Sequence, residues 1–524
     1  MSRTEPTRPV SAFDALGFKP TVEALLSEIR ELYLADSTPW VVGYSGGKDS
    51  TATLQLVWLA IAGIAPAERT KTVHVISTDT LVENPIVAAW VARSLETMST
   101  AAKQADMPIV PHRLTPTVAD TFWVNLIGKG YPAPRPKFRW CTERLKIKPS
   151  NAFISNVVRE NGEVILVLGT RKAESQARAK SMERLEKRRV RDRLSPNGSL
   201  PNSLVYSPVE SWSNDDIWMY VMQVKNPWGF NNKDLLTMYQ GASPDGECPL
   251  VVDTTTPSCG DSRFGCWVCT LVEKDKSMQA MIQNDQEKEW MLPLLELRND
   301  LDQPDDRELR DFRRISGHLT VFHDRLVHGP YKQSARENWL ARVLAAQRWV
   351  RANGPDHVRN IELISADELQ EIRRIWVIEK HEIEDNLPGI YAKAMDAPYP
   401  GPALDDSPVF NAEDMHLLRE LCGEDAILFE LMRELLDVEK RHRSMARRAG
   451  LYGELEKTFR RNFYKNEEDA RTFALGRKQA HDVVQKGRED KDAFLQLPLL
   501  NVADKPLPML SHAPAPSRPG TTTR

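Results

Sequence analysis

Short apolar runs alternate with amphipathic segments through the first part of the chain. The apolar runs have the length of buried strands and cover residues 39–45, 71–78, 108–114, 163–170 and 203–209. Segments with helical spacing of their apolar residues lie between them or before them, at 21–36, 49–64, 86–104 and 151–160. Strands that alternate with helices predict the α/β class, with a parallel twisted sheet covered by helices on both faces.

The pattern changes in the second half of the chain. From about residue 275 onward, amphipathic and highly charged segments such as 365–386 and 411–449 replace the strand-like runs. They predict a mainly α-helical C-terminal domain. The resulting division is a flexible N-terminus (1–20), a nucleotide-binding α/β domain (21–230), a cysteine-rich metal-binding segment (231–280), the helical domain (281–500) and a disordered, Pro-rich tail (501–524).

Composition adds little to this picture, except in one segment. The 524 residues are 41% hydrophobic and carry a formal charge of -3, which gives no overall sign of an acidic partner. Residues 171–193, however, hold ten Lys or Arg against four Asp or Glu, either as a solvated helix or loop or as a surface that faces phosphate. Because the chain lacks a signal sequence and a long uncharged apolar stretch, we expect a soluble, cytoplasmic protein with no membrane partner.

A Gly-rich loop follows the first predicted strand, at residues 45–50 (SGGKDS). Glycines let the backbone approach an anion closely, and the start of the next helix offers N–H groups to phosphate. Lys48 adds a positive charge, and Asp49 could bind magnesium or orient the loop. We therefore expect phosphate contacts from Ser45, Gly46, Gly47, Lys48, Asp49 and Ser50.

Two other motifs fit this loop less well. A Walker loop needs glycine at the position of Val42, so that match fails. Gly43, Ser45 and Gly47 spell G-x-S-x-G, the nucleophile elbow of hydrolases, which also lies between a strand and a helix. The hydrolase interpretation leaves the lysine and the aspartate of the loop without a role.

The loop resembles that of the PP-loop ATP pyrophosphatases, and later segments resemble the related phosphoadenylyl sulfate reductases. These segments are STDTLVEN (77–84), WCTERLKIKP (140–149) and GTRKAESQAR (169–178). The matching residues are Asp79, Glu83 and Asn84, then Cys141, Thr142, Arg144, Lys146, Lys148 and Pro149, and finally Gly169, Arg171, Glu174, Ser175 and Arg178.

The resemblance implies cleavage of ATP between its α and β phosphates, followed by transfer of sulfur to the activated acceptor. It implies that Lys48, Asp49, Arg171 and Cys141 are catalytic, that Asp79, Gly169 and Arg171 also bind ATP, and that Arg144, Lys146, Glu174 and Arg178 contact substrate or phosphate. Loop capping and ion pairing remain the alternative for Asp79, Glu83 and Arg171.

Four of the six cysteines fall within 22 residues: Cys248, Cys259, Cys266 and Cys269. Four thiolates bind either zinc or an iron-sulfur cluster, and the spacing alone leaves both open. Cys141 stands alone among basic residues, which predicts a lowered thiol pKa and a thiolate able to carry sulfane sulfur, with an ordinary half-exposed cysteine as the alternative. Cys422 is expected in the helical core.

The combination of these features resembles the DndC family, the sulfurtransferases of bacterial DNA phosphorothioation. The resemblance implies ATP and magnesium, a [4Fe-4S] cluster on the four cysteines, sulfur from a cysteine desulfurase, and DNA and other proteins of the phosphorothioation complex as partners. An adenylyl sulfate or phosphoadenylyl sulfate reductase, a tRNA thiolation enzyme, and a scaffold that binds nucleotide without turnover remain open.

Overall fold

The computed structural model describes residues 11–189, 191–242, 264–404, 412–443, 445 and 447–489. The predicted tail and the first ten residues lie outside this part of the chain. The chain falls into two compact units, one of residues 1–318 with 328–463 and the other of residues 319–327 with 464–524. The five-part division expected from the sequence stays a prediction.

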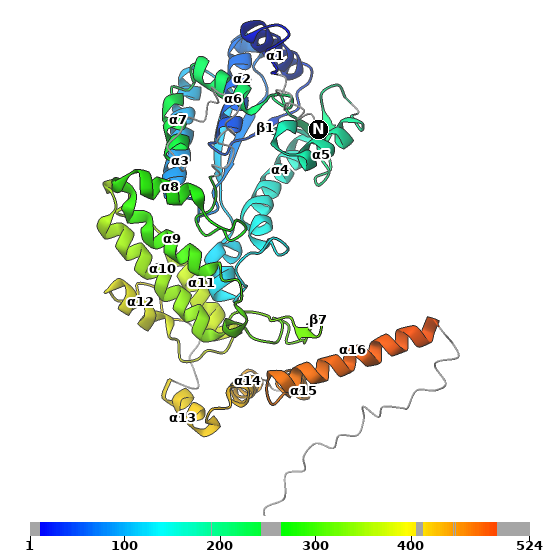
Figure 1. Cartoon of the computed structure of the whole chain (residues 1–524), viewed down its shortest axis with the longest axis vertical. Helices are drawn as coiled ribbons and strands as arrows, with labels where there is room; N and C mark the ends of the chain where they lie inside the picture. The colour runs from blue at the N-terminus through cyan, green and yellow to red at the C-terminus, as the bar shows by residue number, and fades with distance from the viewer. Residues whose placement is uncertain are drawn as a thin grey trace, which may run out of the picture. The chain divides into compact units, whose positions relative to one another are not determined.

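The α/β prediction is confirmed by a six-stranded sheet in the order β3-β2-β1-β4-β6-β5. Figure 1 shows β1 of this sheet between helices. Five strands are parallel, and each lies inside a predicted run: β1 (Trp40–Gly43), β2 (Val73–Thr78), β3 (Ile109–Leu114), β4 (Val164–Val167) and β6 (Ser203–Tyr206). The sixth, β5 (Ser195–Pro196), runs antiparallel to β6 and lies in a segment without a strand pattern.

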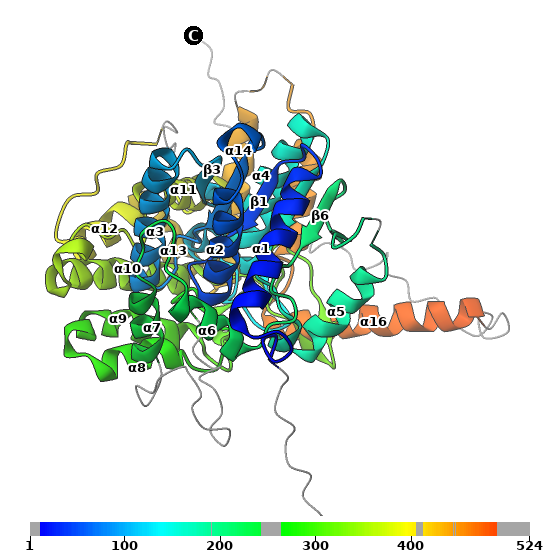
Figure 2. The ribbon, with the colours of Figure 1, turned by 90° about the horizontal axis from the view of Figure 1, so that it is seen from above.

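Alternate side chains of the strands enter two different cores, because successive residues of a strand point to opposite faces. Trp40 and Val42 of β1 lie in the larger core, whereas Val41 between them lies in a smaller one. Figure 2 shows α1 beside α2. The larger core holds α1 (Phe18–Leu34), α2 (Lys48–Ala62), α3 (Pro85–Gln104), α6 (Asn214–Gln223) and α7 (Asn232–Gly241), and the smaller one holds α4 (Lys148–Asn161).

The C-terminal region is helical, as predicted. A separate hydrophobic core joins α8 (Lys276–Asn284), α9 (Leu292–Leu301), α10 (Gln333–Asn353), α11 (Ala366–Arg374) and α12 (Leu387–Met395). Trp140 and Trp267, neighbours of two cysteines, are buried in this helical core. The segment predicted at 411–449 contains α13 (Ala412–Cys422) and α14 (Ala426–Arg443), and Gly423 with φ of 60° separates them. The last helix of this unit is α15 (Leu451–Arg461).

The described residues of the second unit form a short hairpin and a long helix. The hairpin pairs β7 (Val321–Phe322) with β8 (Arg325–Leu326), and the helix is α16 (Glu467–Glu489). Arg471 donates a hydrogen bond from Nε to the carbonyl oxygen of Asp324, 2.8 Å away. Among the described residues of the whole chain, none of the helices combines the length and the apolar character needed to cross a membrane.

Candidate nucleotide and cysteine site

Three of the predicted motifs lie at one edge of the sheet. The parallel strands β1, β2 and β4 end at Gly43, Thr78 and Val167, so the loops that follow them emerge at the same edge. The carboxyl edge of an open parallel sheet is where such folds bind ligands. The fold therefore gathers the 45–50 loop, the 77–84 segment and the 169–178 segment.

Close packing explains why glycine occupies position 46 of the loop. Gly46 has φ of 73°, a conformation that residues with a side chain rarely adopt. A Cβ there would lie 2.5 Å from Cγ2 of Val91 on α3. The Gly46 carbonyl also accepts a hydrogen bond of 3.2 Å from Nε1 of Trp90. Helix α3 thus fixes the course of the loop.

The start of α2 presents its backbone N–H groups to the loop. Gly47 is the N-cap and contributes no capping side chain. Ser50 Oγ instead accepts a hydrogen bond from the Ser45 N–H at 3.1 Å and donates one to the Gly47 carbonyl at 3.0 Å. Free donors at a helix start make a ready anion site. The phosphate contacts expected of the loop stay a prediction.

Asp49 brings two cations together beside this anion site. One carboxylate oxygen lies 3.1 Å from Nζ of Lys48, and the other lies 2.7 Å from Nε of Arg171. Arg171 is buried and also donates from Nη1 to the carbonyl of Trp212 at 3.2 Å. A Cβ on Gly169 would lie 2.8 Å from the Asp49 carbonyl, so the third motif packs directly on α2. A magnesium ion at Asp49 would compete with both cations.

The 77–84 segment is fixed by its own contacts. Asp79 accepts hydrogen bonds from the Leu81 N–H at 2.7 Å and from Nε of Arg113 on β3 at 2.9 Å. These contacts are those of a loop cap and an ion pair, the alternative role considered for Asp79. Its contact with ATP stays a prediction.

The cysteine turn lies against this same segment, which the sequence did not predict. Cys266 forms an antiparallel bridge with Glu83, and the N–H of Trp267 donates to the Val82 carbonyl at 2.9 Å. The N–H of Cys269 donates to the Cys266 carbonyl at 3.0 Å, which closes the turn. Because Val82 and Glu83 follow β2, the turn lies at the carboxyl edge of the sheet.

Polar side chains surround the Cys266 thiol. Thr80 Oγ1 lies 3.2 Å from Sγ, and Glu83 lies 3.8 Å from it. Nζ of Lys146 is 3.3 Å from the Glu83 carboxylate. Burial raises the pKa of Cys266, and the Glu83 charge raises it further, whereas Lys146 lowers it. Burial lowers the pKa of Lys146, but the charges of Cys266 and Glu83 outweigh burial and raise it overall.

Cys141 packs against the same helical core as Cys266 and Trp267. The predicted lowering of its pKa is wrong: burial raises the pKa of Cys141, and the Cys269 charge raises it further. Three of the neighbouring cations are engaged elsewhere, because Arg144 and Lys148 pair with Asp120 while Lys146 pairs with Glu83.

Comparison with known proteins agrees with this architecture. Residues 39–229, from β1 to just beyond α6, match the family model described as the phosphoadenosine phosphosulfate reductase domain. These residues form a phosphoadenosine phosphosulfate reductase-like domain. The match supports a PP-loop function of the sulfur-transfer or reductase type.

A relative with 26% identity over 245 residues is an uncharacterized protein of Methanocaldococcus jannaschii. The similar region covers 47% of this chain and 39% of that protein. The name of that protein assigns it no activity.

Cys141 lies within the reductase-like domain, and Cys266 and Cys269 lie in the segment that follows it. Within the described ranges, no three Cys, His, Asp or Glu residues are grouped closely enough to bind a metal ion. Cys248 and Cys259, the other two predicted ligands, lie outside the described residues. Thiols on a C-x-x-C turn are suitable soft ligands for iron or zinc. Cys422 is half-exposed on α13, so its expected place in the core is wrong.

Glu174 and Arg178 lie where the reductase-like domain enters its basic helix, α5 (Gln176–Glu186). Their side chains pair at 3.3 Å, and Glu174 also accepts a hydrogen bond from the Arg171 N–H at 2.9 Å. Ser175 caps the helix by accepting a hydrogen bond from the Arg178 N–H. Substrate contacts of Glu174 and Arg178 stay a prediction.

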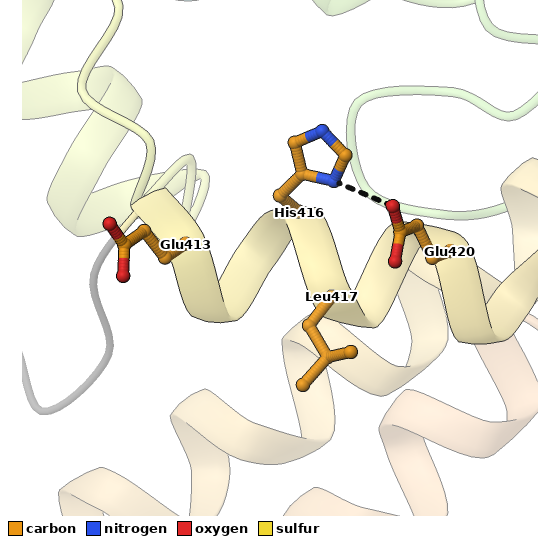
Figure 3. A pocket seen from close by; sticks show the side chains of 4 residues that line it. All are labelled: Glu413, His416, Leu417 and Glu420. Atoms are coloured by element: carbon orange, nitrogen blue, oxygen red, sulfur yellow. Dashed lines mark ion pairs between the residues drawn. The ribbon is translucent and has the colours of Figure 1, made fainter.

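A shallow surface hollow on α13 lies outside the reductase-like domain (Figure 3). Its lining consists of Glu413, His416, Leu417 and Glu420, which share one face of a single helix. His416 Nδ1 and Glu420 are 3.5 Å apart. The hollow contains none of the predicted site residues.

Proposed function

We propose that this protein is an ATP-dependent sulfurtransferase with ATP pyrophosphatase activity. It activates a DNA backbone phosphate and places sulfur where a non-bridging oxygen was. The observation that carries the proposal is the position of the Cys266–Cys269 turn, at the same sheet edge as the 45–50 loop. Nucleotide activation and sulfur delivery need such proximity, because the activated phosphate must meet sulfur before water hydrolyses it.

The loop supplies the groups for the first step. A DNA phosphate oxygen attacks the α phosphorus of ATP, and the bond to the bridging oxygen of pyrophosphate breaks. Negative charge then grows on the departing pyrophosphate. The N–H groups at the start of α2 and the Lys48 ammonium stabilise that charge, and Asp49 holds Lys48 and Arg171 in position.

The cysteines supply the second step. A persulfide sulfur attacks the adenylylated DNA phosphorus, a P–S bond forms, and AMP leaves with the former phosphate oxygen. A thiolate then attacks the sulfur of the carrier cysteine, which frees the phosphorothioate and leaves a disulfide for a thiol reductant to reduce. Cys266 and Cys269, with Cys248 and Cys259, would hold a [4Fe-4S] cluster, which supplies a redox-active sulfur site when bound. Cys141, which packs against the same helical core as Cys266, is our candidate carrier of sulfur from a cysteine desulfurase.

Helix α5 offers a surface for the DNA backbone. Of the ten cations in 171–193, several are held by acids: Arg189 pairs with Glu210, for example, and Arg191 with Glu163. Four others are exposed on one face of α5 or just beyond the end of this helix: Lys180, Arg184, Lys187 and Arg188. None of these four has an acidic partner within 4 Å in the described part of the chain. We expect them to bind DNA phosphates with a strong salt dependence.

The deciding experiment measures pyrophosphate release from ATP together with phosphorothioate dinucleotides in DNA from cells that contain the desulfurase and the other complex proteins. The wild type should yield both products, and Lys48→Ala should lose both. A protein that releases sulfite from adenylyl sulfate and leaves DNA unmodified is a reductase instead. Sulfur found in tRNA would indicate tRNA thiolation. If the protein releases no pyrophosphate with any acceptor, the remaining interpretation is a scaffold that binds nucleotide without turnover.

A further inference from the structure

Tyr239 of α7 touches the start of the nucleotide helix. Its hydroxyl oxygen accepts a hydrogen bond of 3.4 Å from the N–H of Lys48, the first residue of α2. A Cβ on Gly47 would lie only 3.2 Å from the same oxygen. Because the first N–H groups of a helix are those offered to an anion, the phenol oxygen holds a donor that a phosphate oxygen would use.

The ring of Tyr239 also contacts the segment that leads into the cysteine turn. It meets Phe264 edge to face, with ring centroids 4.6 Å apart and an interplanar angle of 86°. Trp218 packs in the same manner on the Tyr239 ring, with centroids 5.1 Å apart. Phe264 packs against both the sheet core and the helical core, and Cys266 lies two residues further along.

The chemistry of the phenol suits contact with phosphate. Burial raises the pKa of Tyr239, and the charge of Asp49 raises it further, so the hydroxyl stays protonated at neutral pH. A neutral hydroxyl can donate to a phosphate oxygen as well as accept from an N–H. Nζ of Lys48 lies 5.6 Å from the centre of the ring, so ammonium and phenol are neighbours.

We infer that Tyr239 contacts the pyrophosphate end of the bound nucleotide and relays occupancy of the loop to the Cys266–Cys269 turn through Phe264. A phosphate oxygen takes the N–H of Lys48, and the hydroxyl turns to donate to that phosphate. The ring then shifts against Phe264 and moves the backbone leading to Cys266. Tyr239 is thus a nucleotide contact and a positioning residue for the turn. The inference rests on the proposed function, since it requires that the loop bind ATP.

The test uses the full chain and α,β-methylene ATP, which the proposed reaction cannot cleave. Tyr239→Phe keeps the ring and removes the hydroxyl that would donate to an anionic phosphate oxygen, so we expect calorimetric affinity to fall by about tenfold or more. Hydrogen exchange of amides 264–270 should change when saturating nucleotide binds the wild type, and this response should vanish in Tyr239→Phe. Phe264→Leu keeps an apolar side chain and should keep nucleotide affinity but lose the exchange response.

Tyr33→Phe is the matched control, because Tyr33 is also buried in the sheet core and its hydroxyl donates to the Lys71 carbonyl rather than contacting the loop. It should bind nucleotide and respond like the wild type. Unchanged affinity in Tyr239→Phe overturns the nucleotide contact. A wild-type protein that binds nucleotide without any exchange response at 264–270, or a response that persists in Phe264→Leu, overturns the relay. A wild type that neither binds nor cleaves ATP contradicts the proposed function instead.

Discussion

Nε of Arg171 lies 2.7 Å from a carboxylate oxygen of Asp49, although 121 residues separate the two along the chain. The guanidinium is buried and the carboxylate is partly exposed. Since Asp49 also binds Lys48, one carboxylate holds the cation of the loop and the cation of the 169–178 segment. Asp49 therefore holds the side chains of Lys48 and Arg171 in position.

Asp49→Asn should therefore disturb catalysis more than folding. The amide keeps the shape but no longer balances the two cations, so we expect pyrophosphate release to fall by about 100-fold, the usual size of losing one preorganised electrostatic contact. Initial rates at saturating ATP measure the effect. Asp305→Asn, which removes an exposed carboxylate paired with Arg307, serves as the control and should keep full activity. Equal rates in Asp49→Asn and the wild type would contradict the role given to Asp49.

Gly169→Ala should destabilise the protein where the 169–178 segment packs on α2. The added methyl would lie 2.8 Å from the Asp49 carbonyl and 3.0 Å from Thr53 Oγ1, so backbone must shift. Overpacking of this kind costs about 1–3 kcal/mol, and thermal melting will detect it. Gly198→Ala has nothing within 4 Å of its new methyl and should melt like the wild type. If both variants melt alike, the packing argument fails.

Acid should weaken the sheet at its β2–β3 edge. His74 Nδ1 and His112 Nε2 are 3.0 Å apart beneath Phe153 of α4. Burial lowers the pKa of both imidazoles, and the charge of His112 lowers that of His74 further, although Glu160 partly opposes this. A lowered pKa in the folded state means that the unfolded chain binds more protons below its own pKa, near 6.5. The contribution of this pair to the free energy of unfolding is therefore largest above about pH 6.5 and declines as the pH falls below that value.

Urea unfolding at pH 7.5 and 5.5 measures that decline. Replacing both residues by glutamine should flatten the pH dependence, because the folded state then no longer excludes these two protons. His416→Gln, an exposed histidine on α13, should leave the pH dependence as it is. If the free energy of unfolding of the double variant depends on pH as that of the wild type does, groups other than His74 and His112 cause the acid sensitivity.

Cluster content tests the cysteine assignment. After anaerobic purification, Cys266→Ser and Cys269→Ser should each lose iron and sulfide, because three thiolates hold the proposed cluster poorly. Cys422→Ser, on a half-exposed helix face, should retain both. Cys141→Ser should retain iron but lose DNA sulfur if Cys141 carries sulfur. Zinc in place of iron in the wild type would contradict the cluster, and iron loss in Cys141→Ser would make Cys141 a ligand.

Much of the sheet could be predicted, because a buried parallel strand needs a continuous apolar run and each such run became a strand. The antiparallel strand Ser195–Pro196 could not, since two residues carry no period and only pairing with β6 makes them a strand. The thiol pKa of Cys141 was predicted wrongly for a related reason. Arg144, Lys146 and Lys148 pair with carboxylates that are distant in the sequence, and burial raises the pKa of the Cys141 thiol.

The sequence by itself determined the order of the strands along the chain, the Gly-rich loop at the start of α2 and the helical second half. Hydrophobic periodicity, the conformational freedom of glycine and the signals that start a helix each act within a few residues. Only the tertiary structure decided that Asp49 holds Arg171, that Cys266 lies against Glu83, and that Tyr239 touches both Lys48 and Phe264. Such contacts depend on which strand ends share an edge of the sheet, and that follows from packing of the whole chain rather than from local pattern.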